Sequence, residues 1–97
     1  MSDLAHIVTV RAQAGKSDLL GAALAEMVTL SRQEPGCRIC ELHQANDEAA
    51  LWMVYERWQD QEAFDSHMQQ PYTLRFIERM GDLASEPADV RAFDHTA

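Results

Sequence analysis

The sequence predicts an α+β domain of the ferredoxin-like type, with the element order βαββαβ and an antiparallel sheet. Apolar and polar residues alternate as they do in strands over residues 4–12, 37–45 and 50–58. Apolar residues instead recur at helical spacing in the segments 19–32 and 60–80. A weakly strand-like segment, 88–93, completes the order.

Length and composition limit the number of domains and the kind of partner. Ninety-seven residues, 46% of them hydrophobic, allow one modest core, so we expect a single domain over residues 1–97. Sixteen acidic residues against eight basic ones give a formal charge of -8, and Lys16 is the only lysine, so we expect no nucleic-acid surface. No apolar run resembles a signal peptide or reaches the length of a membrane helix. We therefore expect a cytoplasmic protein without membrane attachment.

The beginning of the chain should form a strand and then a helix. Alternate residues of a strand share a face, and the apolar face of the first strand would carry Leu4, His6, Val8, Val10 and Ala12. Gly15 ends the strand, and Ser17 is a suitable N-cap for the helix over 19–32. This helix would end before Pro35-Gly36, and it would bury Leu20, Ala23, Leu24, Met27 and Val28.

The next two strands should form a hairpin around Asn46-Asp47-Glu48. One face of the strand 50–58 would carry Trp52, Val54, Glu56 and Trp58. The opposite face would carry Leu51, Met53, Tyr55 and Arg57. Helices cover only one face of such a sheet. The face with Leu51, Met53 and Tyr55 would then be exposed, and it is too apolar to leave in water. We therefore expect a homodimer in which a second copy covers it, sheet against sheet.

Two helical segments should follow the hairpin. Asp60 is a plausible N-cap for a helix whose apolar stripe is Ala63, Phe64, His67 and Met68. Pro71 is suited to the first position of another helix that ends before Gly81. The buried side of this helix would consist of Leu74, Phe76, Ile77 and Met80.

Glu56 and His67 are the main candidates for catalysis, because each interrupts an apolar face. The helix must run back across the sheet, with Glu56 roughly 7 Å from the end of its strand and His67 roughly 10 Å from the start of its helix. The two side chains could therefore face one cavity. Burial and the charge of the neighbouring group would then shift the pKa of each side chain. The structural alternative is that Glu56 bonds a backbone amide or Arg57, and that His67 is a core histidine.

The remaining histidines and the cysteines are weaker candidates. We expect His6 and His43 at the surface or at strand ends. Cys37 and Cys40 form a C-x-x-C pattern, but residues three apart in a strand lie on opposite faces and about 10 Å apart. That separation exceeds the limit of roughly 7 Å between the Cα atoms of a disulfide. A second pair of zinc ligands is also missing, so we expect reduced thiols without zinc.

Several motifs, in their order and spacing, resemble the antibiotic biosynthesis monooxygenase (ABM) domain family. They are Glu34-Pro35-Gly36-Cys37, Tyr55-Glu56-Arg57-Trp58, Asp60, Ala63, His67 and Pro71-Tyr72. The resemblance covers nearly the whole chain and is nearest to the small quinol monooxygenases of the YgiN type. It implies a dimeric α+β barrel. Members of the family include monooxygenases that oxidise phenols or quinols without metal or flavin, isomerases, haem-degrading enzymes and proteins of no known activity.

The chain departs from the family pattern at several positions. Cys40 stands where members often have a tyrosine, which would alter the pocket, and Ala14 replaces a common proline. The haem-degrading branch has a tryptophan where this chain has His67, and a haem-ligating histidine where it has Phe76. The resemblance therefore does not extend to haem degradation.

The residues and the resemblance together favour a cofactor-independent monooxygenase acting on a quinol or phenol. His67 would take the phenolic proton, and the deprotonated substrate could then donate an electron to O2. Glu56 would orient the imidazole and stabilise its charged form. Flat substrates bind well against aromatic walls, and the expected pocket residues are Trp52, Trp58, Phe64, Met68, Tyr72 and Cys40. For Trp52 and Phe64, ordinary core packing is the competing interpretation.

Two other functions could use the same residues. One is a proton-transfer isomerase in which His67 removes a proton beside a carbonyl, although the scarcity of lysine leaves few groups to hold an enolate or a phosphate. The other is a non-catalytic dimer that binds a small ligand or is associated with stress. Oxygen uptake with a hydroquinone would separate the first function from both alternatives.

Overall fold

A computed structural model describes residues 3–97. The elements are β1 (Leu4–Arg11), α1 (Ser17–Ser31), β2 (Cys37–Gln44), β3 (Leu51–Trp58), α2 (Gln61–Met68), α3 (Pro71–Leu83) and β4 (Asp89–Asp94). The expected ferredoxin-like order is confirmed. The second helix of that order is divided into two helices, α2 and α3.

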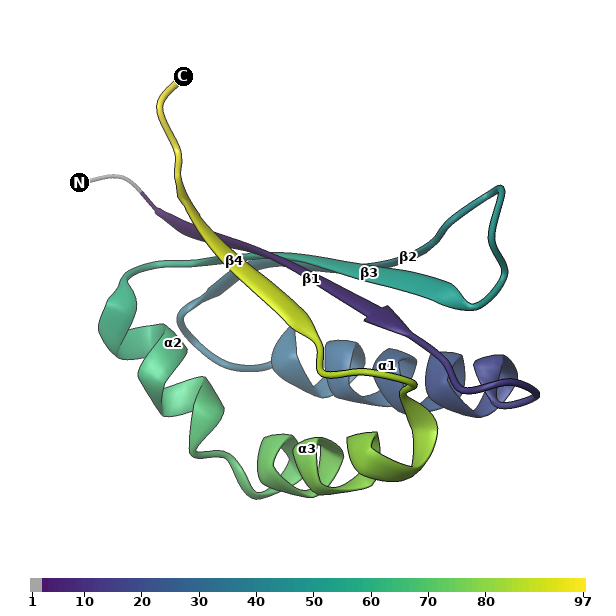
Figure 1. The fold of residues 1–97 in the computed structure, drawn as a ribbon. Helices are drawn as coiled ribbons and strands as arrows, with labels where there is room; N and C mark the ends of the chain where they lie inside the picture. The colour runs from purple at the N-terminus through teal and green to yellow at the C-terminus, as the bar shows by residue number, and fades with distance from the viewer. Residues whose placement is uncertain (1–2) are drawn as a thin grey trace.

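The four strands form one antiparallel sheet in the order β2-β3-β1-β4. Figure 1 shows the three helices on one side of this sheet and none on the other. Helices α1 and α3 lie side by side, whereas α2 lies under the end of the sheet that is closest to the N-terminus. The side chains packed between the sheet and α2, among them Trp58 and His67, therefore form a group apart from the main core between the sheet and α1.

The main core is formed by aliphatic side chains from α1 and the two central strands. Leu20, Leu24 and Val28 of α1 pack against Val10 of β1 and Val54 of β3. The alternation expected for β3 is confirmed, since its inward residues Val54, Glu56 and Trp58 are all buried.

Helix α1 begins differently from the sequence-based expectation. Lys16, not Ser17, occupies the N-cap position, and it makes no side-chain capping bond. The Ser17 hydroxyl instead donates to the carbonyl oxygen of Ala49 at 2.5 Å and accepts from Trp52 Nε1 at 3.0 Å. The expectation of a serine cap is wrong because this hydroxyl ties the helix to the β2-β3 hairpin.

Helix α3 begins at Pro71 as expected, but it continues past Gly81 and presents a different face to the core. Leu74 and Ile77, expected to be buried, are 49% and 47% exposed. The inward positions are Thr73, Phe76, Met80 and Leu83. Their spacing of three and four residues is also helical, so two apolar stripes compete on this helix. Packing against α1 selects the one that includes a buried threonine.

The cysteines share a face of the sheet, which corrects the expectation of opposite faces. An irregularity between Cys37 and Ile39 shifts the β2-β3 register, so Cys37 pairs with Trp58 and Cys40 with Glu56. Directly opposed residues share a face, and an extra residue at a bulge reverses the alternation after it. Both cysteines are free. Burial, with the charge of Glu56, raises the pKa of the Cys40 thiol to about 12.

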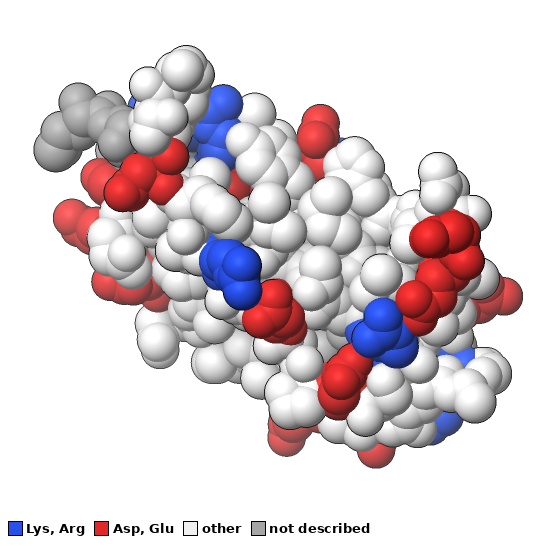
Figure 2. All heavy atoms as spheres, turned by 45° about the horizontal axis from the view of Figure 1, so that its top comes forward, with Lys and Arg blue, Asp and Glu red and all other residues white. Residues whose placement is uncertain are grey.

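The helix-free face of the sheet is mostly uncharged (Figure 2). Met53 and Tyr55 of β3 and Ile7 of β1 are half-buried there, and Phe93 of β4 is exposed. Among the charged side chains of this face, Arg11 pairs with both Glu48 and Glu86. The expected sheet-to-sheet homodimer stays a prediction, and this surface is compatible with it.

No helix within residues 3–97 combines the length and the apolar character needed to cross a membrane.

A close approach between Gly36 and Ala63 fixes α2 against the turn that precedes β2. A Cβ atom on Gly36 would lie 2.4 Å from the Cβ of Ala63. The Gly36 carbonyl also accepts a hydrogen bond from the backbone N–H of Gln59, at 2.8 Å. We expect Gly36→Ala to lower the free energy of unfolding by about 1–3 kcal/mol, because α2 must move away. Urea denaturation would measure this loss.

Two further variants make this stability prediction specific. Gly81→Ala is the control, since a Cβ there meets nothing within 4 Å and α3 should gain about 0.5–1 kcal/mol. Adding Ala63→Gly to Gly36→Ala removes the clashing atom, so it should recover part of the loss. An unchanged free energy of unfolding in Gly36→Ala would contradict the packing described.

Candidate active site

His67 is placed in the interior by a well-defined helix start. Oδ1 of Asp60 accepts a hydrogen bond from the backbone N–H of Ala63 at 2.9 Å, which confirms Asp60 as the N-cap of α2. Two turns later His67 points inward and is only 3% exposed. Its Nδ1 lies 2.7 Å from Oε2 of Glu34. His67 is therefore held by a carboxylate from a segment 33 residues away.

Glu34 is the centre of a three-residue hydrogen-bond network. It lies in the turn between α1 and β2, where its backbone N–H donates to the Ser31 carbonyl at 3.0 Å. The hydroxyl of Tyr72, at the start of α3, donates to the same Oε2 atom that contacts His67. Burial, together with this hydrogen bond, raises the pKa of Tyr72 to about 12. One carboxylate thus joins α2, α3 and the turn before β2.

Glu56 is not the hydrogen-bond partner of His67, which corrects the expected pairing. It is buried at 4% exposure on β3, and its nearest basic partner is His6, with 3.9 Å between His6 Nδ1 and Oε1. That distance is too long for a hydrogen bond. The expectation compared only the depths of Glu56 and His67 along their elements. It did not fix their lateral positions, and Glu34 occupies the place beside the imidazole.

Glu56 nevertheless belongs to the same polar interior. Burial raises the pKa of Glu56 above its usual value, the charge of His67 opposes that shift, and the charge of Glu34 adds to it. The indole N–H of Trp58 is near enough to Glu56 to oppose the rise of its pKa. Within residues 3–97, however, neither this N–H nor the buried hydroxyl of Thr73 makes a hydrogen bond of normal geometry. The interior thus contains polar groups to which a bound molecule could hydrogen-bond.

His6 is an interior residue, so the expectation that it lies at the surface is wrong. It is 5% exposed, lies opposite Glu56 across the β1-β3 ladder, and stacks on Phe64 with 4.1 Å between ring centroids. Burial, followed by the charge of His67, lowers the pKa of His6. His43 is at the surface as expected.

Three of the expected pocket residues surround the imidazole of His67. The ring centroids of Trp58, Tyr72 and Phe64 lie 4.5, 6.1 and 6.2 Å from that of His67. Cys40 is buried directly opposite Glu56, on the neighbouring strand. Met68 follows His67 in α2 and is half-buried. These residues support an aromatic site between the sheet and α2.

Trp52 does not join this group. It precedes Glu56 by four residues on β3, which corresponds to about 13 Å along the strand. Its indole donates to the hydroxyl of Ser17, and its ring leaves no room for a Cβ atom on Gly21, at 2.5 Å. Trp52 therefore packs against α1, at the other end of the sheet.

A surface hollow of about 330 Å³ reaches the network from outside. It is lined by Glu34, Pro35, Gly36, Gln59, Asp60, Glu62, Ala63, Ser66 and Gln70. The Glu34 side chain is 11% exposed, so its carboxylate lies at the boundary between the hollow and His67. Glu34 is the one member of the network that lines this hollow, so a proton could pass between solvent and the network at its carboxylate.

Within residues 3–97, no group of three histidine, cysteine or acidic side chains is arranged to hold a metal ion. The expectation that the protein works without a metal or an organic cofactor stays a prediction.

Sequence reasoning missed the roles of Glu34 and His6. Strand alternation already placed His6 on the inward face with Val8 and Val10, so that signal was present. Glu34 follows a helix in an irregular turn, where no periodicity indicates a direction. Only its position in the Glu34-Pro35-Gly36-Cys37 motif singled it out.

The raised pKa of Glu56 predicts an effect on stability. The folded protein retains the Glu56 proton to a higher pH than the unfolded chain, so this group's stabilising contribution is complete below the unfolded pKa and is lost as pH rises through the folded value. Glu56→Gln stays neutral at every pH. We therefore expect the variant to melt at a higher temperature than the natural chain at pH 8. The difference between the two melting temperatures should become smaller toward pH 4.

Melting followed by circular dichroism from pH 4 to 8 would measure this difference. His6 has a lowered pKa, so its contribution makes stability rise with pH below about pH 6.5. Because His6 is present in both proteins, this contribution largely cancels when their melting temperatures are compared. A difference in melting temperature that grows toward acid pH would show that Glu56 is stabilised as a charged group.

The sequence profile of the family described as "Antibiotic biosynthesis monooxygenase" matches residues 4–79. The protein named "Putative monooxygenase Rv0793" from Mycobacterium tuberculosis is 34% identical over 71 residues, covering 73% of this chain and 69% of that protein. "Uncharacterized protein sll1783" from Synechocystis is 33% identical over 63 residues, or 65% of this chain, and the match spans only 43% of its length.

Solved structures give a similar result. The structure of PA3566 from Pseudomonas aeruginosa matches with a TM-score of 0.95 and 28% identity, over 100% of this chain and 97% of that one. The structure of Rv0793 matches with a TM-score of 0.93 and 27% identity, over 99% and 97% of the two chains. The matched family segment contains Glu34, Glu56, His67 and Tyr72. The chain therefore belongs to the antibiotic biosynthesis monooxygenase family.

Proposed function

We propose that this protein is a cofactor-independent monooxygenase that oxidises a quinol or another electron-rich phenol with O2. The observation that carries the proposal is the buried imidazole of His67, bonded through Nδ1 to Glu34 and surrounded by aromatic rings. Membership of the monooxygenase family supports the same reaction class.

His67 would act as the general base in this reaction. Glu34 holds Nδ1, so the ring is oriented with Nε2 available, and this nitrogen makes no hydrogen bond to another residue within 3–97. Nε2 would accept the phenolic proton, and Glu34 would stabilise the imidazolium that forms. The role first assigned to Glu56 thus passes to Glu34, while Glu56 would bind the substrate's second hydroxyl.

The substrate supplies the electrons, and O2 accepts them. The phenolate gives one electron to O2, and the resulting radical and superoxide combine at a ring carbon that carries a hydrogen atom. The imidazolium of His67 then returns its proton to the peroxide, which becomes a hydroperoxide. Loss of water leaves one oxygen atom on the ring as a carbonyl and the other in water. The protein's part is to remove the proton and to exclude bulk water from the intermediates. Trp58, Phe64 and Tyr72 are suited to that role, because aromatic walls bind a flat ring and keep the site dry.

Oxygen consumption by the purified protein tests this proposal. We expect uptake of O2 with a panel of hydroquinones and naphthoquinols, above the rate of autoxidation, in the presence of a chelator and without added flavin. The product should contain one oxygen atom more and two hydrogen atoms fewer than the substrate, as mass spectrometry would show. Equal uptake with and without the protein across the panel would contradict the proposed reaction.

A proton-transfer isomerase is the second candidate. The buried indole N–H of Trp58 favours it, because this donor approaches Glu56 without a hydrogen bond of normal geometry and could hold an enolate oxygen near His67. Exchange of a substrate proton for deuterium beside a carbonyl, without O2 uptake, would support this candidate over the monooxygenase.

Glu34 is proposed as a positioning residue, and Glu34→Gln tests that role. The amide keeps the shape but loses the charge-assisted bond to His67, which is worth about 1.5–3 kcal/mol. We expect kcat to fall by about tenfold to a hundredfold, with KM nearly unchanged because the ring bound by the aromatic walls is unaffected. Steady-state kinetics would separate the two parameters. A change in KM alone would show that Glu34 binds substrate instead of orienting His67.

A further inference from the structure

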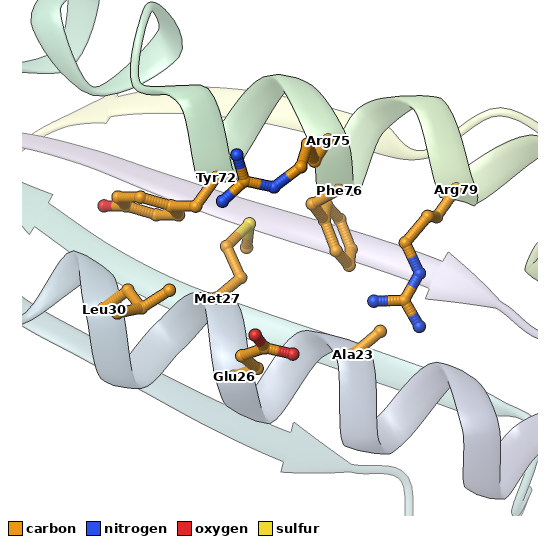
Figure 3. Close-up of a pocket in the computed structure, with 8 residues that line it drawn as sticks. All are labelled: Ala23, Glu26, Met27, Leu30, Tyr72, Arg75, Phe76 and Arg79. Carbon is orange, nitrogen blue, oxygen red and sulfur yellow. The ribbon is translucent and has the colours of Figure 1, made fainter.

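A second hollow lies between α1 and α3, away from the face of the sheet. It has a volume of about 130 Å³. It is lined by Ala23, Glu26, Met27 and Leu30 of α1 and by Tyr72, Arg75, Phe76 and Arg79 of α3. Figure 3 shows these side chains extending from the two helices toward one another. We refer to this hollow as the α1-α3 groove.

The floor of the groove is apolar and its size fits one aromatic ring. Met27 and Phe76 are partly buried and pack on the hydrophobic core, and Ala23 is buried. An apolar protein cavity of about 150 Å³ is large enough to bind benzene. The groove is slightly smaller but open on one side, so a single ring could lie against Met27 and Phe76 with its substituents toward solvent.

The walls of the groove carry charges of opposite sign. Arg75 and Arg79 are four residues apart and so project from the same side of α3, and their guanidinium groups extend over the groove on either side of Phe76 (Figure 3). Within residues 3–97 neither arginine is in an ion pair, whereas Arg11, Arg38 and Arg57 each are. In a chain with twice as many acidic as basic residues, two uncommitted guanidinium groups at one hollow provide a local anion site.

Glu26 places a carboxylate on the opposite wall (Figure 3). It would repel a plain anion, but it would accept a hydrogen bond from a ligand hydroxyl. A molecule with a hydroxyl at one end and a carboxylate at the other would satisfy both walls.

We propose that the α1-α3 groove binds a hydroxylated aromatic carboxylate. The ring lies on Met27 and Phe76, the carboxylate pairs with Arg75 and Arg79, and the hydroxyl donates to Glu26. Tyr72 forms one end of the groove, and its hydroxyl reaches Glu34 beside His67. A ligand in the groove therefore contacts a member of the His67 network without entering that site. The proposal holds whether or not the protein consumes O2.

Calorimetric titration of the full chain with 4-hydroxybenzoate tests the proposal. We expect saturable binding of one molecule per chain, weakened by added salt because the arginines are exposed. Phenol, which lacks the carboxylate, should bind at least about tenfold more weakly. Arg75→Gln and Arg79→Gln should each weaken 4-hydroxybenzoate binding by about tenfold, and Arg91→Gln, on β4, is the matched control and should leave it unchanged.

Glu26→Gln tests the other wall. The natural chain should prefer 4-hydroxybenzoate to benzoate, and this preference should shrink in the variant because the acceptor has lost its charge. Amide chemical shifts should move for α1 and α3 residues of the groove. Absence of saturable binding, affinities unaffected by Arg75→Gln and Arg79→Gln, or shifts confined to α2 and β3 would each overturn the proposal.

Discussion

His67→Ala should lower the rate of quinol oxidation by about a hundredfold or more, the usual contribution of a general base. The imidazole is buried, is oriented through Nδ1 by Glu34, and faces the rings of Trp58 and Tyr72. The other three histidines are not in the same position, since burial lowers the pKa of His6, and His43 and His95 are exposed. Oxygen uptake with the best substrate of the quinol panel would measure the loss.

The control for this experiment must separate chemistry from folding. Removing a buried imidazole leaves a cavity and takes one hydrogen-bond partner from Glu34, which keeps only Tyr72, so His67→Ala will also be less stable. His67→Gln keeps more of the volume and can hydrogen-bond Glu34, yet its amide is no base. We expect it to be folded and still about a hundredfold slower. Oxygen uptake at the natural rate in folded His67→Gln would show that His67 is a packing residue.

Met53→Asp should convert the proposed homodimer to monomers or prevent folding. Met53 lies on the helix-free face of the sheet, between Thr9 on β1 and His43 on β2. In a sheet-to-sheet dimer its side chain would be buried, and an aspartate there would lack a partner. Removing the partner of a buried charge typically costs about 3–5 kcal/mol. Light scattering across the micromolar range would report the mass of each variant.

Leu19→Asp is the matched control for the dimer prediction. It also replaces a large apolar residue by aspartate, but Leu19 is 58% exposed and lies in the first turn of α1, where a negative charge is favourable. This variant should keep the mass and the stability of the natural chain. A monodisperse monomer of the natural chain at micromolar concentration would contradict the predicted interface.

The strands and the order of elements could be predicted because they follow from local patterns. Alternation along residues 51–58 determined which face of β3 carries Val54, Glu56 and Trp58, and Asp60 indicated where α2 begins. The predictions failed where two local patterns compete. Ser17 can cap a helix or bind a neighbouring loop, and α3 offers two apolar stripes, so contacts with other elements made the choice in both cases.

The candidate site was only partly predictable for the same reason. The sequence singled out His67, Glu56, Trp58, Phe64 and Tyr72, and the structure brings all five into one region. The sequence could not show that Trp52, four residues before Glu56, packs against α1. Nor could it show that the bulge after Cys37 turns both cysteines to one face.

By itself, the sequence determined the fold class, the inward faces of β1 and β3 and the buried position of His67. These features depend on backbone periods of two and about 3.6 residues, which are set by local geometry. Only the tertiary structure decided that the imidazole of His67 pairs with Glu34 and, through it, with Tyr72. Those contacts join residues more than thirty positions apart. Their lateral positions depend on how the helices cross the sheet and on the path of an irregular turn, and no local period encodes either.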